Sequence, residues 1–209
     1  MKNYQYLQQK YVVNTYVNRG VTFVKGAGIY LFDENNEKYL DMMSNYGVNI
    51  FGHVDRDITD QISKQLNILT TLHGSFNNNI RAEASELLIN RSGSSYKFVY
   101  WSNSGAEANE AALKFAVAMT GKKKIIACEN AYHGKTLGTL SVTAGEKYRK
   151  PFLPLLWDVV FIKHNNPQAL EEVIDKNAAA FIVEPIQGEG GIYVPDKNYL
   201  KKVREICNK

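Results

Sequence analysis

The stretch that most constrains the fold is an apolar, aromatic run that leads directly into a small-residue helix start. Residues 97–101 read K-F-V-Y-W, which predicts a buried strand. Residues 102–116 follow as S-N-S-G-A-E-A-N-E-A-A-L-K-F-A, which predicts a helix over 105–120 that begins at Ser104, Gly105 and Ala106. Unpaired backbone N–H groups and the positive end of the helix dipole bind phosphate at such a start. The sequence therefore predicts a phosphate-bearing cofactor.

The composition is that of an ordinary globular protein. The chain has 209 residues, 44% of them hydrophobic and 22% charged, with a net charge of +4. The one lysine run, at residues 122–124, follows the predicted helix, where cations complement the negative end of the dipole. We therefore expect no nucleic-acid partner.

Nothing in the sequence indicates export or membrane insertion. The N-terminus has no apolar signal-peptide region, and no stretch reaches the length that spans a membrane. Cys128 and Cys207 lie far apart and form no C-x-x-C pattern, which is typical of a reducing compartment. The expected location is the cytoplasm.

The arrangement of predicted elements changes along the chain. In the first part, the sequence predicts three short strands, the second and third joined by a hairpin turn at residues 33–37. Two helices are predicted after them, over 57–72 and 80–90. From residue 97, strands alternate with helices, which predicts an α/β fold with a mainly parallel, helix-covered sheet. We therefore divide the chain into an α+β segment, residues 1–69, and part of a cofactor-binding domain, residues 70–209. The predicted strands are 21–24, 28–32, 38–41, 97–101, 124–128, 159–163 and 179–184, and the later helices are 105–120, 167–176 and 196–208.

Two further blocks follow predicted parallel strands, where ligands bind in open α/β sheets. The first, residues 131–136, reads A-Y-H-G-K-T and places Tyr132 where it can stack on a flat ring. It is not a nucleotide-binding P-loop, because Glu129 stands where that motif needs glycine. The second, residues 184–191, reads E-P-I-Q-G-E-G-G and supplies Glu184 and Glu189. These acids could belong to a binding site or be solvated in a Pro/Gly loop, and the sequence leaves both interpretations open.

Taken together, the three blocks resemble the class III family of pyridoxal-phosphate-dependent aminotransferases. The likeness covers nearly the whole chain and is strongest to the acetylornithine, ornithine and putrescine branch. It implies fold type I, pyridoxal 5'-phosphate as the cofactor, and a homodimer when the protein is full length. The segments that carry it are Thr15-Tyr16, residues 21–41, Gly52-His53, S-N-S-G-A-E-A-N-E-A-A, A-Y-H-G-K-T-L-G-T-L-S-V-T-A, residues 148–156 and E-P-I-Q-G-E-G-G.

The resemblance implies cofactor-binding roles for residues in all three blocks. Ser104, Gly105 and Ala106 would hold the phosphate, and Tyr132 would stack on the pyridine ring. Glu184 would lie near the phenolic oxygen and the reacting amine. The neighbouring His133 is expected to be a structural hydrogen-bonding residue of the cofactor site; a lone histidine is a poor metal ligand, and no metal site is expected.

Substrate-binding roles follow in the same way. Glu189 would be the gating acid, and Tyr16 and Tyr46 match substrate-pocket tyrosines, although both could equally be core or dimer-contact aromatics. The related enzymes usually have arginine where this chain has Lys135. Arginine grips a carboxylate with two parallel hydrogen bonds and lysine does not, so a diamine donor such as putrescine becomes plausible.

The resemblance also implies that two essential groups lie outside this sequence. The aspartate for the pyridine nitrogen and the Schiff-base lysine come later in the family than the last residue, Lys209. The expected function is therefore transfer of the terminal amino group of acetylornithine, ornithine or a diamine to 2-oxoglutarate, with this chain as an N-terminal part that is inactive alone. Two alternatives stay open: another pyridoxal-phosphate reaction, such as 4-aminobutyrate transamination, decarboxylation or an aminomutase reaction, or a non-catalytic, truncated binding partner.

Overall fold

A computed structural model describes residues 2–93 and 96–209. The chain divides into two compact units, residues 1–84 and 85–209, which are described separately below. The domain boundary that we place at residue 70 stays a prediction. Across the described ranges, no helix has both the length and the apolar character needed to cross a membrane.

The first unit contains a three-stranded antiparallel sheet in the order β1-β2-β3. The predicted strands are present with shifted ends, and the turn between β2 and β3 forms because the Asp33 carboxylate accepts hydrogen bonds from the N–H groups of Asn35 and Glu37. The predicted helix over 57–72 stops early, where the Asn67 side chain donates to the Ser63 carbonyl. The elements are α1 (Tyr4–Tyr11), β1 (Phe23–Ala27), β2 (Tyr30–Asp33), β3 (Lys38–Leu40), α2 (Ser44–Gly47), α3 (Arg56–Leu66) and α4 (Asn79–Arg91), which crosses the unit boundary.

The second unit is an α/β layer structure built on a parallel sheet in the order β5-β4-β6. Strands and helices alternate along the chain, so the predicted α/β fold class is confirmed. The elements are α5 (Gly105–Thr120), β4 (Lys124–Cys128), α6 (Leu137–Val142), α7 (Glu146–Arg149), the 3-10 helix η1 (Lys150–Phe152), β5 (Asp158–Ile162), α8 (Pro167–Val173), β6 (Ala178–Phe181) and α9 (Tyr199–Asn208).

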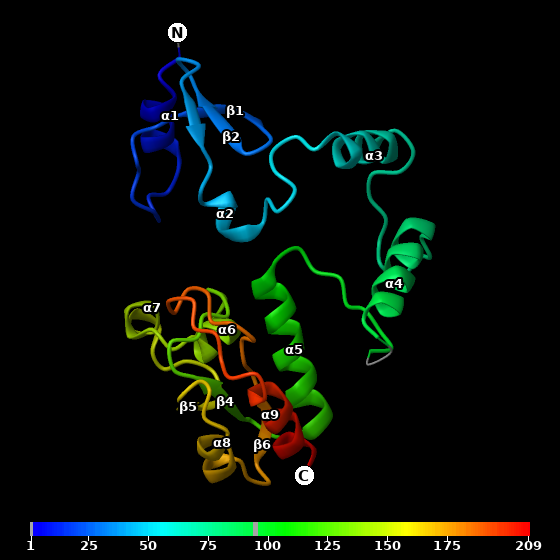
Figure 1. The fold of residues 1–209 in the computed structure, drawn as a ribbon, viewed down its shortest axis with the longest axis vertical. Helices are drawn as coiled ribbons and strands as arrows, with labels where there is room; N and C mark the ends of the chain where they lie inside the picture. Colours follow the sequence, from blue (N-terminus) through cyan, green and yellow to red (C-terminus); the bar gives the residue numbers. More distant parts are fainter. Residues whose placement is uncertain (1, 94–95) are drawn as a thin grey trace. The chain divides into compact units, whose positions relative to one another are not determined.

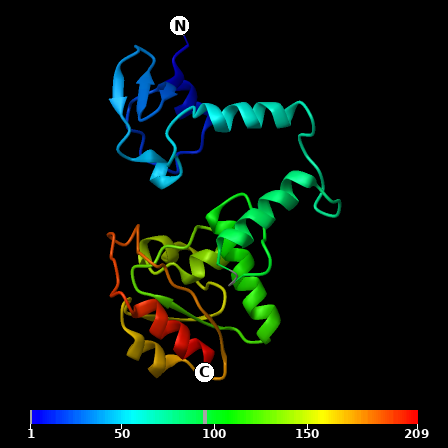
Figure 2. The ribbon, with the colours of Figure 1, turned by 45° about the vertical axis from the view of Figure 1, so that its right-hand side comes forward.

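Helices cover both faces of this sheet (Figure 1). Successive residues of β4 point to opposite faces, as the pleat requires. Ile125 and Ala127 pack with Leu113 of α5 and with α6, whereas Ile126 packs with Leu170 of α8 and with α9. A second view shows α8 and α9 lying together on one side of the strands (Figure 2). The two hydrophobic clusters hold the carboxyl ends of the strands in place.

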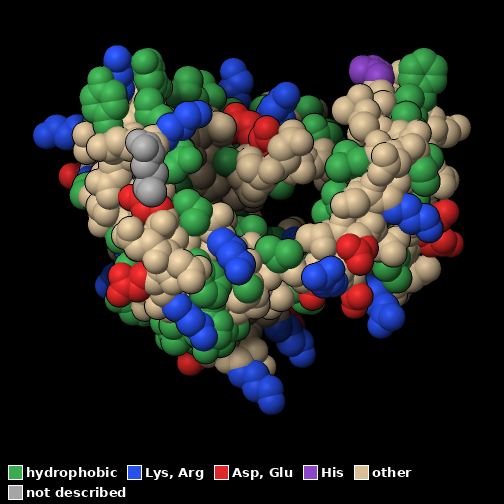
Figure 3. All heavy atoms as spheres, turned by 90° about the horizontal axis from the view of Figure 1, so that it is seen from above, with side chains coloured by type: hydrophobic (Ala, Val, Ile, Leu, Met, Phe, Trp, Pro, Cys, Tyr) green, Lys and Arg blue, Asp and Glu red, His purple; other side chains and the backbone are tan. Residues whose placement is uncertain are grey.

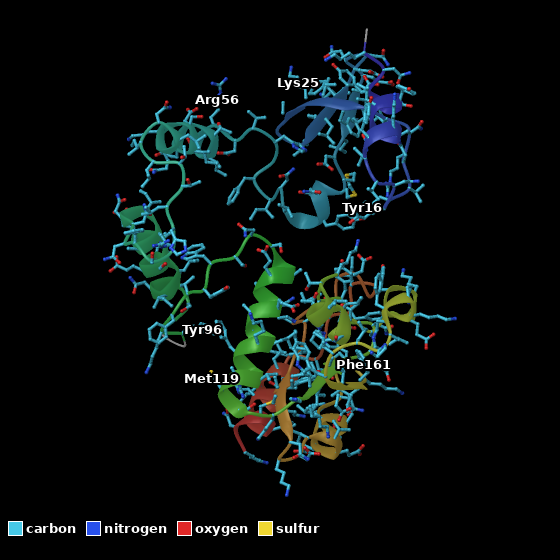
Figure 4. All side chains as sticks on the ribbon, turned by 180° about the vertical axis from the view of Figure 1, so that it is seen from behind. Tyr16, Lys25, Arg56, Tyr96, Met119 and Phe161 are labelled. Carbon is cyan, nitrogen blue, oxygen red and sulfur yellow. The ribbon has the colours of Figure 1, made fainter. Side chains whose placement is uncertain are left out.

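Helix α5 begins and ends where the sequence predicts. Ser104 caps its N-terminus by accepting a hydrogen bond from the Glu107 N–H at 3.1 Å, and Gly121 ends it in the left-handed conformation. The helical spacing of Ala108, Ala112, Phe115, Ala116 and Met119 predicts the face that packs on the sheet. This prediction is wrong in part, because Ala112, Phe115 and Met119 are exposed and Leu113 is buried instead. Met119 projects from the far end of α5 (Figure 4).

The predicted strand at residues 97–101 does not form. Residues 96–101 are irregular, and Phe98 is 90% exposed. A strand requires a neighbour to complete its hydrogen-bond ladder, and among the described residues the parallel sheet contains only β5, β4 and β6. Hydrophobic side chains are exposed on the face shown in Figure 3. The exposed large hydrophobic residues of the chain include Tyr96, Phe98, Tyr100 and Trp101.

Candidate functional site

The second unit brings the three sequence blocks together. Tyr132 follows β4 and Glu184 follows the neighbouring β6, and the Tyr132 N–H donates to Glu184 Oε2 at 3.2 Å. The first block joins them through Ala106, whose β-carbon lies against Gly134: a β-carbon added to Gly134 would lie 2.7 Å from it. All three blocks therefore meet beyond the carboxyl ends of the parallel strands, where such sheets bind ligands.

The start of α5 has the features of a phosphate cradle. In the described part of the chain, no group accepts a hydrogen bond from the N–H of Gly105 or Ala106, and nothing lies within 4 Å of the position of a β-carbon on Gly105. The helix is 16 residues long, so its dipole adds to these donors. Two free donors and open space at a helix start suit the phosphate of a cofactor.

A capping interaction also places a negative charge at this helix start. Glu107 donates its N–H to Ser104 and its carboxylate accepts from the Asn103 N–H at 2.5 Å. This reciprocal arrangement fixes the turn before the helix. The Ser104 hydroxyl oxygen therefore accepts as a cap while its O–H can still donate, and this O–H and the free N–H groups of the next two residues are the donors available for a phosphate.

The candidate ring-stacking residue has an aromatic neighbour that the sequence reasoning missed. Tyr132 is half-buried, and its ring meets the Tyr148 ring edge-on with the centroids 5.8 Å apart. The Tyr148 hydroxyl lies 3.5 Å from Glu189 Oε1. Tyr148, in α7, thus links the candidate stacking residue to the candidate gating acid. Its only signal in the sequence was its place in the Y-R-K-P-F-L-P-L-L stretch.

His133 lies beside Tyr132 and is 6% exposed. Its backbone N–H donates to Thr143 Oγ1 at 3.0 Å, and its backbone carbonyl accepts from Asn109 Nδ2 at 2.9 Å. Burial lowers the pKa of the ring to about 4, and Nε2 has no hydrogen-bond partner in the structure. The ring is therefore neutral at pH 7. In the described ranges, no group of three or more His, Cys, Asp or Glu side chains is placed to hold a metal.

The loop after β6 is fixed to its surroundings by its backbone and by a buried amide. His164 Nε2 lies 3.1 Å from the Glu184 carbonyl oxygen, and the buried Gln187 donates to the Glu129 carbonyl at 2.8 Å. A β-carbon on Gly190 would lie 2.6 Å from the Asn130 carbonyl oxygen, so only glycine permits this close approach. Glu184 is therefore half-buried and bonded, whereas Glu189 is exposed to solvent.

A cavity of about 380 Å³ opens at the same edge of the sheet, between the loops that follow β4, β5 and β6. The candidate cofactor residues do not line it, so it lies beside the site. Its lining comes from Glu129, Asn130, Lys163, His164, Asn165, Gln187, Tyr193 and Val194.

The remaining candidates are exposed. Lys135 lies in the loop after Gly134. Tyr16 and Tyr46 belong to the first unit and are 72% and 77% exposed (Figure 4 labels Tyr16). Tyr46 sits in a left-handed turn, with φ of 56°, that the Asp41 carboxylate braces by accepting the N–H groups of Met43 and Ser44.

Two polar residues of α5 were also missed. Asn109 and Glu110 lie on the same face as Ala106 and the buried Leu113, and both are half-buried. The sequence signal that could have identified them is their spacing of three and four residues from Ala106, which places them on the same helix face. Polar side chains on a packed helix face need hydrogen-bond partners.

Known proteins resemble this chain along almost its full length. The family model described as "Aminotransferase class-III" matches residues 11–209. The chain is 39% identical to an acetylornithine aminotransferase of Archaeoglobus fulgidus, over 97% of this chain and 53% of the relative. It is 43% identical to a [LysW]-aminoadipate semialdehyde/glutamate semialdehyde transaminase of Sulfurisphaera tokodaii, over 94% of this chain and 51% of the relative.

Solved structures give the same picture. Ornithine aminotransferase from Toxoplasma gondii ME49 superposes with a TM-score of 0.91 at 32% identity, covering 98% of this chain and 50% of that protein. Another structure of the Toxoplasma gondii enzyme, with a TM-score of 0.90, is described as having partial occupancy of PLP at its active site. The chain thus spans about half the length of the relatives it matches.

Proposed function

Because this chain belongs to the class III aminotransferase family, we propose that the protein carrying it binds pyridoxal 5'-phosphate and transfers the terminal amino group of acetylornithine, ornithine or a diamine to 2-oxoglutarate. The observation that carries the proposal is the meeting of three groups at one sheet edge. These are the free N–H groups at the start of α5, the ring of Tyr132 and the carboxylate of Glu184.

The residues present fit this cofactor. The N–H groups of Gly105 and Ala106 would bind the phosphate, and Tyr132 would stack on the ring. Glu184, anchored through the Tyr132 N–H, would hold its carboxylate near the reacting amine. Pyridoxal phosphate, when bound, supplies the electron-withdrawing ring that stabilises negative charge on the carbon next to that amine. The neutral His133 places no positive charge beside the ring at neutral pH.

For the amine donor, Lys135 supports a substrate without a tightly gripped α-carboxylate, because lysine lacks the planar fork that binds carboxylate at two points. Several relatives are named acetylornithine aminotransferases, which supports a donor with a terminal amine. Glu189, Tyr16 and Tyr46 are the chain's other proposed substrate contacts. The Tyr148 hydroxyl near Glu189 would keep that carboxylate on the Tyr132 side of the site.

We further propose that residues outside this sequence supply the Schiff-base lysine and the aspartate for the pyridine nitrogen, and that the 209-residue chain alone does not transaminate. The half-length coverage of the relatives supports this proposal. A cytoplasmic homodimer is the proposed state of the protein at its native length.

The test begins with the intact mass of the natively expressed protein, detected through a peptide of this region. The protein is then purified at that length and mixed with ornithine, acetylornithine, putrescine or 4-aminobutyrate, with 2-oxoglutarate as acceptor. Glutamate formation with one of the first three donors, abolished by Tyr132→Ala, supports the proposal. Glutamate only from 4-aminobutyrate would move the assignment to another reaction of the family. A native mass of 23.6 kDa without cofactor binding would favour a non-catalytic partner.

A further inference from the structure

Helix α5 holds the loop that carries Tyr132 through three side-chain hydrogen bonds. Asn109 Nδ2 donates to the His133 carbonyl at 2.9 Å. Glu110 Oε2 accepts from Thr136 Oγ1 at 2.6 Å and from the Thr139 N–H at 3.0 Å. All three lengths lie in the normal range for hydrogen bonds of their kind, and the two bonds to Glu110 end on one side-chain oxygen.

Glu110 also acts as a cap supplied by another helix. Thr136 is the N-cap residue of α6, yet its side chain makes no capping bond to that helix. The Thr139 N–H is one of the first-turn donors that a helix leaves unpaired. Glu110, which belongs to α5, accepts the hydrogen bond of the Thr139 N–H and also that of the Thr136 hydroxyl. The start of α6 is therefore tied to α5, in addition to the bonds that Thr136 and Thr139 make with each other at 2.8 and 3.2 Å.

Two glycines make this close approach possible. The Glu110 carboxylate lies against Gly138, where the position of a β-carbon is already filled by the carboxylate atoms. Gly134 is packed just as closely: a β-carbon added to it would lie 2.7 Å from the β-carbon of Ala106 and 2.6 Å from Thr139 Oγ1. Both glycines of the Y-H-G-K-T-L-G stretch thus face α5, and a larger residue at either position would push the loop away from the helix.

We propose that Asn109 and Glu110 are positioning residues that fix the distance between the phosphate cradle and the ring-stacking Tyr132. The inference rests on the proposed function. The cradle is the first turn of α5, and a helix rises 1.5 Å per residue, so Glu110 lies about 9 Å along the same rigid rod from Ser104. The N–H of Tyr132 is bonded to Glu184 and that of His133 to Thr143. Those contacts tie the loop to the segments that follow β6 and α6, and Asn109 and Glu110 tie it to the helix whose first turn is the proposed phosphate cradle.

The test separates the effect of side-chain length from the effect of charge at residue 110. Glu110→Gln keeps the length of the side chain and an oxygen that accepts both bonds, but loses the charge. Glu110→Asp keeps the charge but is one methylene too short. Positioning predicts that Gln preserves function better than Asp, whereas a purely electrostatic role predicts the reverse. Lys114→Ala, on the exposed side of the same helix, is the matched control.

Three readouts apply to each variant. In the 209-residue chain, amide hydrogen exchange at Thr139 should speed up about tenfold or more in Glu110→Asp and change little in Glu110→Gln. In the native-length protein, the dissociation constant for pyridoxal phosphate should rise about tenfold in Glu110→Asp and less than about threefold in Glu110→Gln. The dissociation constant for inorganic phosphate, which needs only the cradle, should not change in either.

The outcomes separate this inference from the proposed function. If both dissociation constants rise together in Glu110→Asp, residue 110 merely supports the helix and the inference is wrong, while the function stands. If wild type binds inorganic phosphate but not pyridoxal phosphate, the proposed function fails and takes the inference with it. Equal effects of Asp and Gln on pyridoxal phosphate binding also overturn the inference.

A double variant provides an independent check. Gly138→Ala alone should displace the Glu110 carboxylate and speed exchange at Thr139 about as much as Glu110→Ala does. With Glu110→Ala already present, the space is empty and Gly138→Ala should add less than about a twofold change, because residues in contact are not additive. Independent, multiplying effects would show that Gly138 and Glu110 do not act through one contact.

Discussion

Acid should destabilise the second unit through His133, a buried histidine whose ring has an unpartnered Nε2. Burial lowers its pKa from 6.5 to about 4 in the folded chain. The folded state therefore binds the proton more weakly than the unfolded state. The stability that depends on this residue is complete above pH 6.5 and is lost as the pH falls from there towards 4.

The size of the effect follows from the pKa difference. At about 1.36 kcal/mol for each pH unit of difference, the full loss is about 3 kcal/mol, and at about pH 5 the loss is already about 2 kcal/mol relative to neutral pH. Carboxylates add their own pH dependence, so the measured quantity must be a difference between wild type and a variant that lacks the imidazole. His133→Gln serves this purpose because its side chain is polar, of similar length and does not titrate.

Urea unfolding of the 209-residue chain at about pH 7.5 and about pH 5 provides the assay. The two tryptophans, Trp101 and Trp157, both lie in the second unit, so their fluorescence reports its unfolding alone. Wild type should lose about 2 kcal/mol more than His133→Gln between the two conditions. Equal losses in the two proteins would refute the reasoning, because they would mean that His133 titrates alike in the folded and unfolded chain.

Further perturbations test the core, the cysteines and the first unit. Ile126→Ala, at a fully buried position of the central strand, should lower the free energy of unfolding by about 2–5 kcal/mol, whereas Met119→Ala, at an 86% exposed position, should stay within about 0.5 kcal/mol in the same urea titration. Burial raises the pKa of the Cys128 thiol to about 11 and also raises the pKa of Cys207, but Cys207 is only half-buried, so mass spectrometry after iodoacetamide treatment near pH 8 should find Cys207 modified and Cys128 unmodified until urea is added. Asp41→Asn should speed chymotrypsin cleavage in the loop that follows it, because Asp41 binds His53 and two backbone N–H groups there; unchanged cleavage would show that the loop does not depend on these bonds.

Local signals predicted the parts of the fold that depend on neighbours in sequence. The ends of α5 follow from Ser104 as N-cap and Gly121 as C-cap. The bounds of β4 were predicted to the residue, because a run of five residues, K-I-I-A-C, lies between the end of α5 and a turn. The turn after β2 follows from Asp33 in the same way. The helix ends and the turn are decided by bonds between residues a few positions apart, whereas β4 has a clear local pattern but forms its ladder with the distant β5 and β6.

Contacts between distant residues were not predictable in this way. The strand expected at residues 97–101 has the composition of a strand but lacks a partner in the described part of the chain. The inward face of α5 was misjudged, because apolar spacing does not say which of two possible faces meets the sheet. The short helix α6 escaped detection because its cap, Glu110, lies 26 residues before Thr136.

The sequence by itself determined that a helix with free N–H groups follows the segment at 97–101, that an aromatic follows one parallel strand, and that a carboxylate follows another. These are local facts of composition and spacing. Only the tertiary structure decided that Tyr132 bonds to Glu184 and that Asn109 and Glu110 hold the loop between them. The physical reason is that hydrogen bonds between residues far apart in sequence depend on strand order and helix packing, which many distant side chains set together.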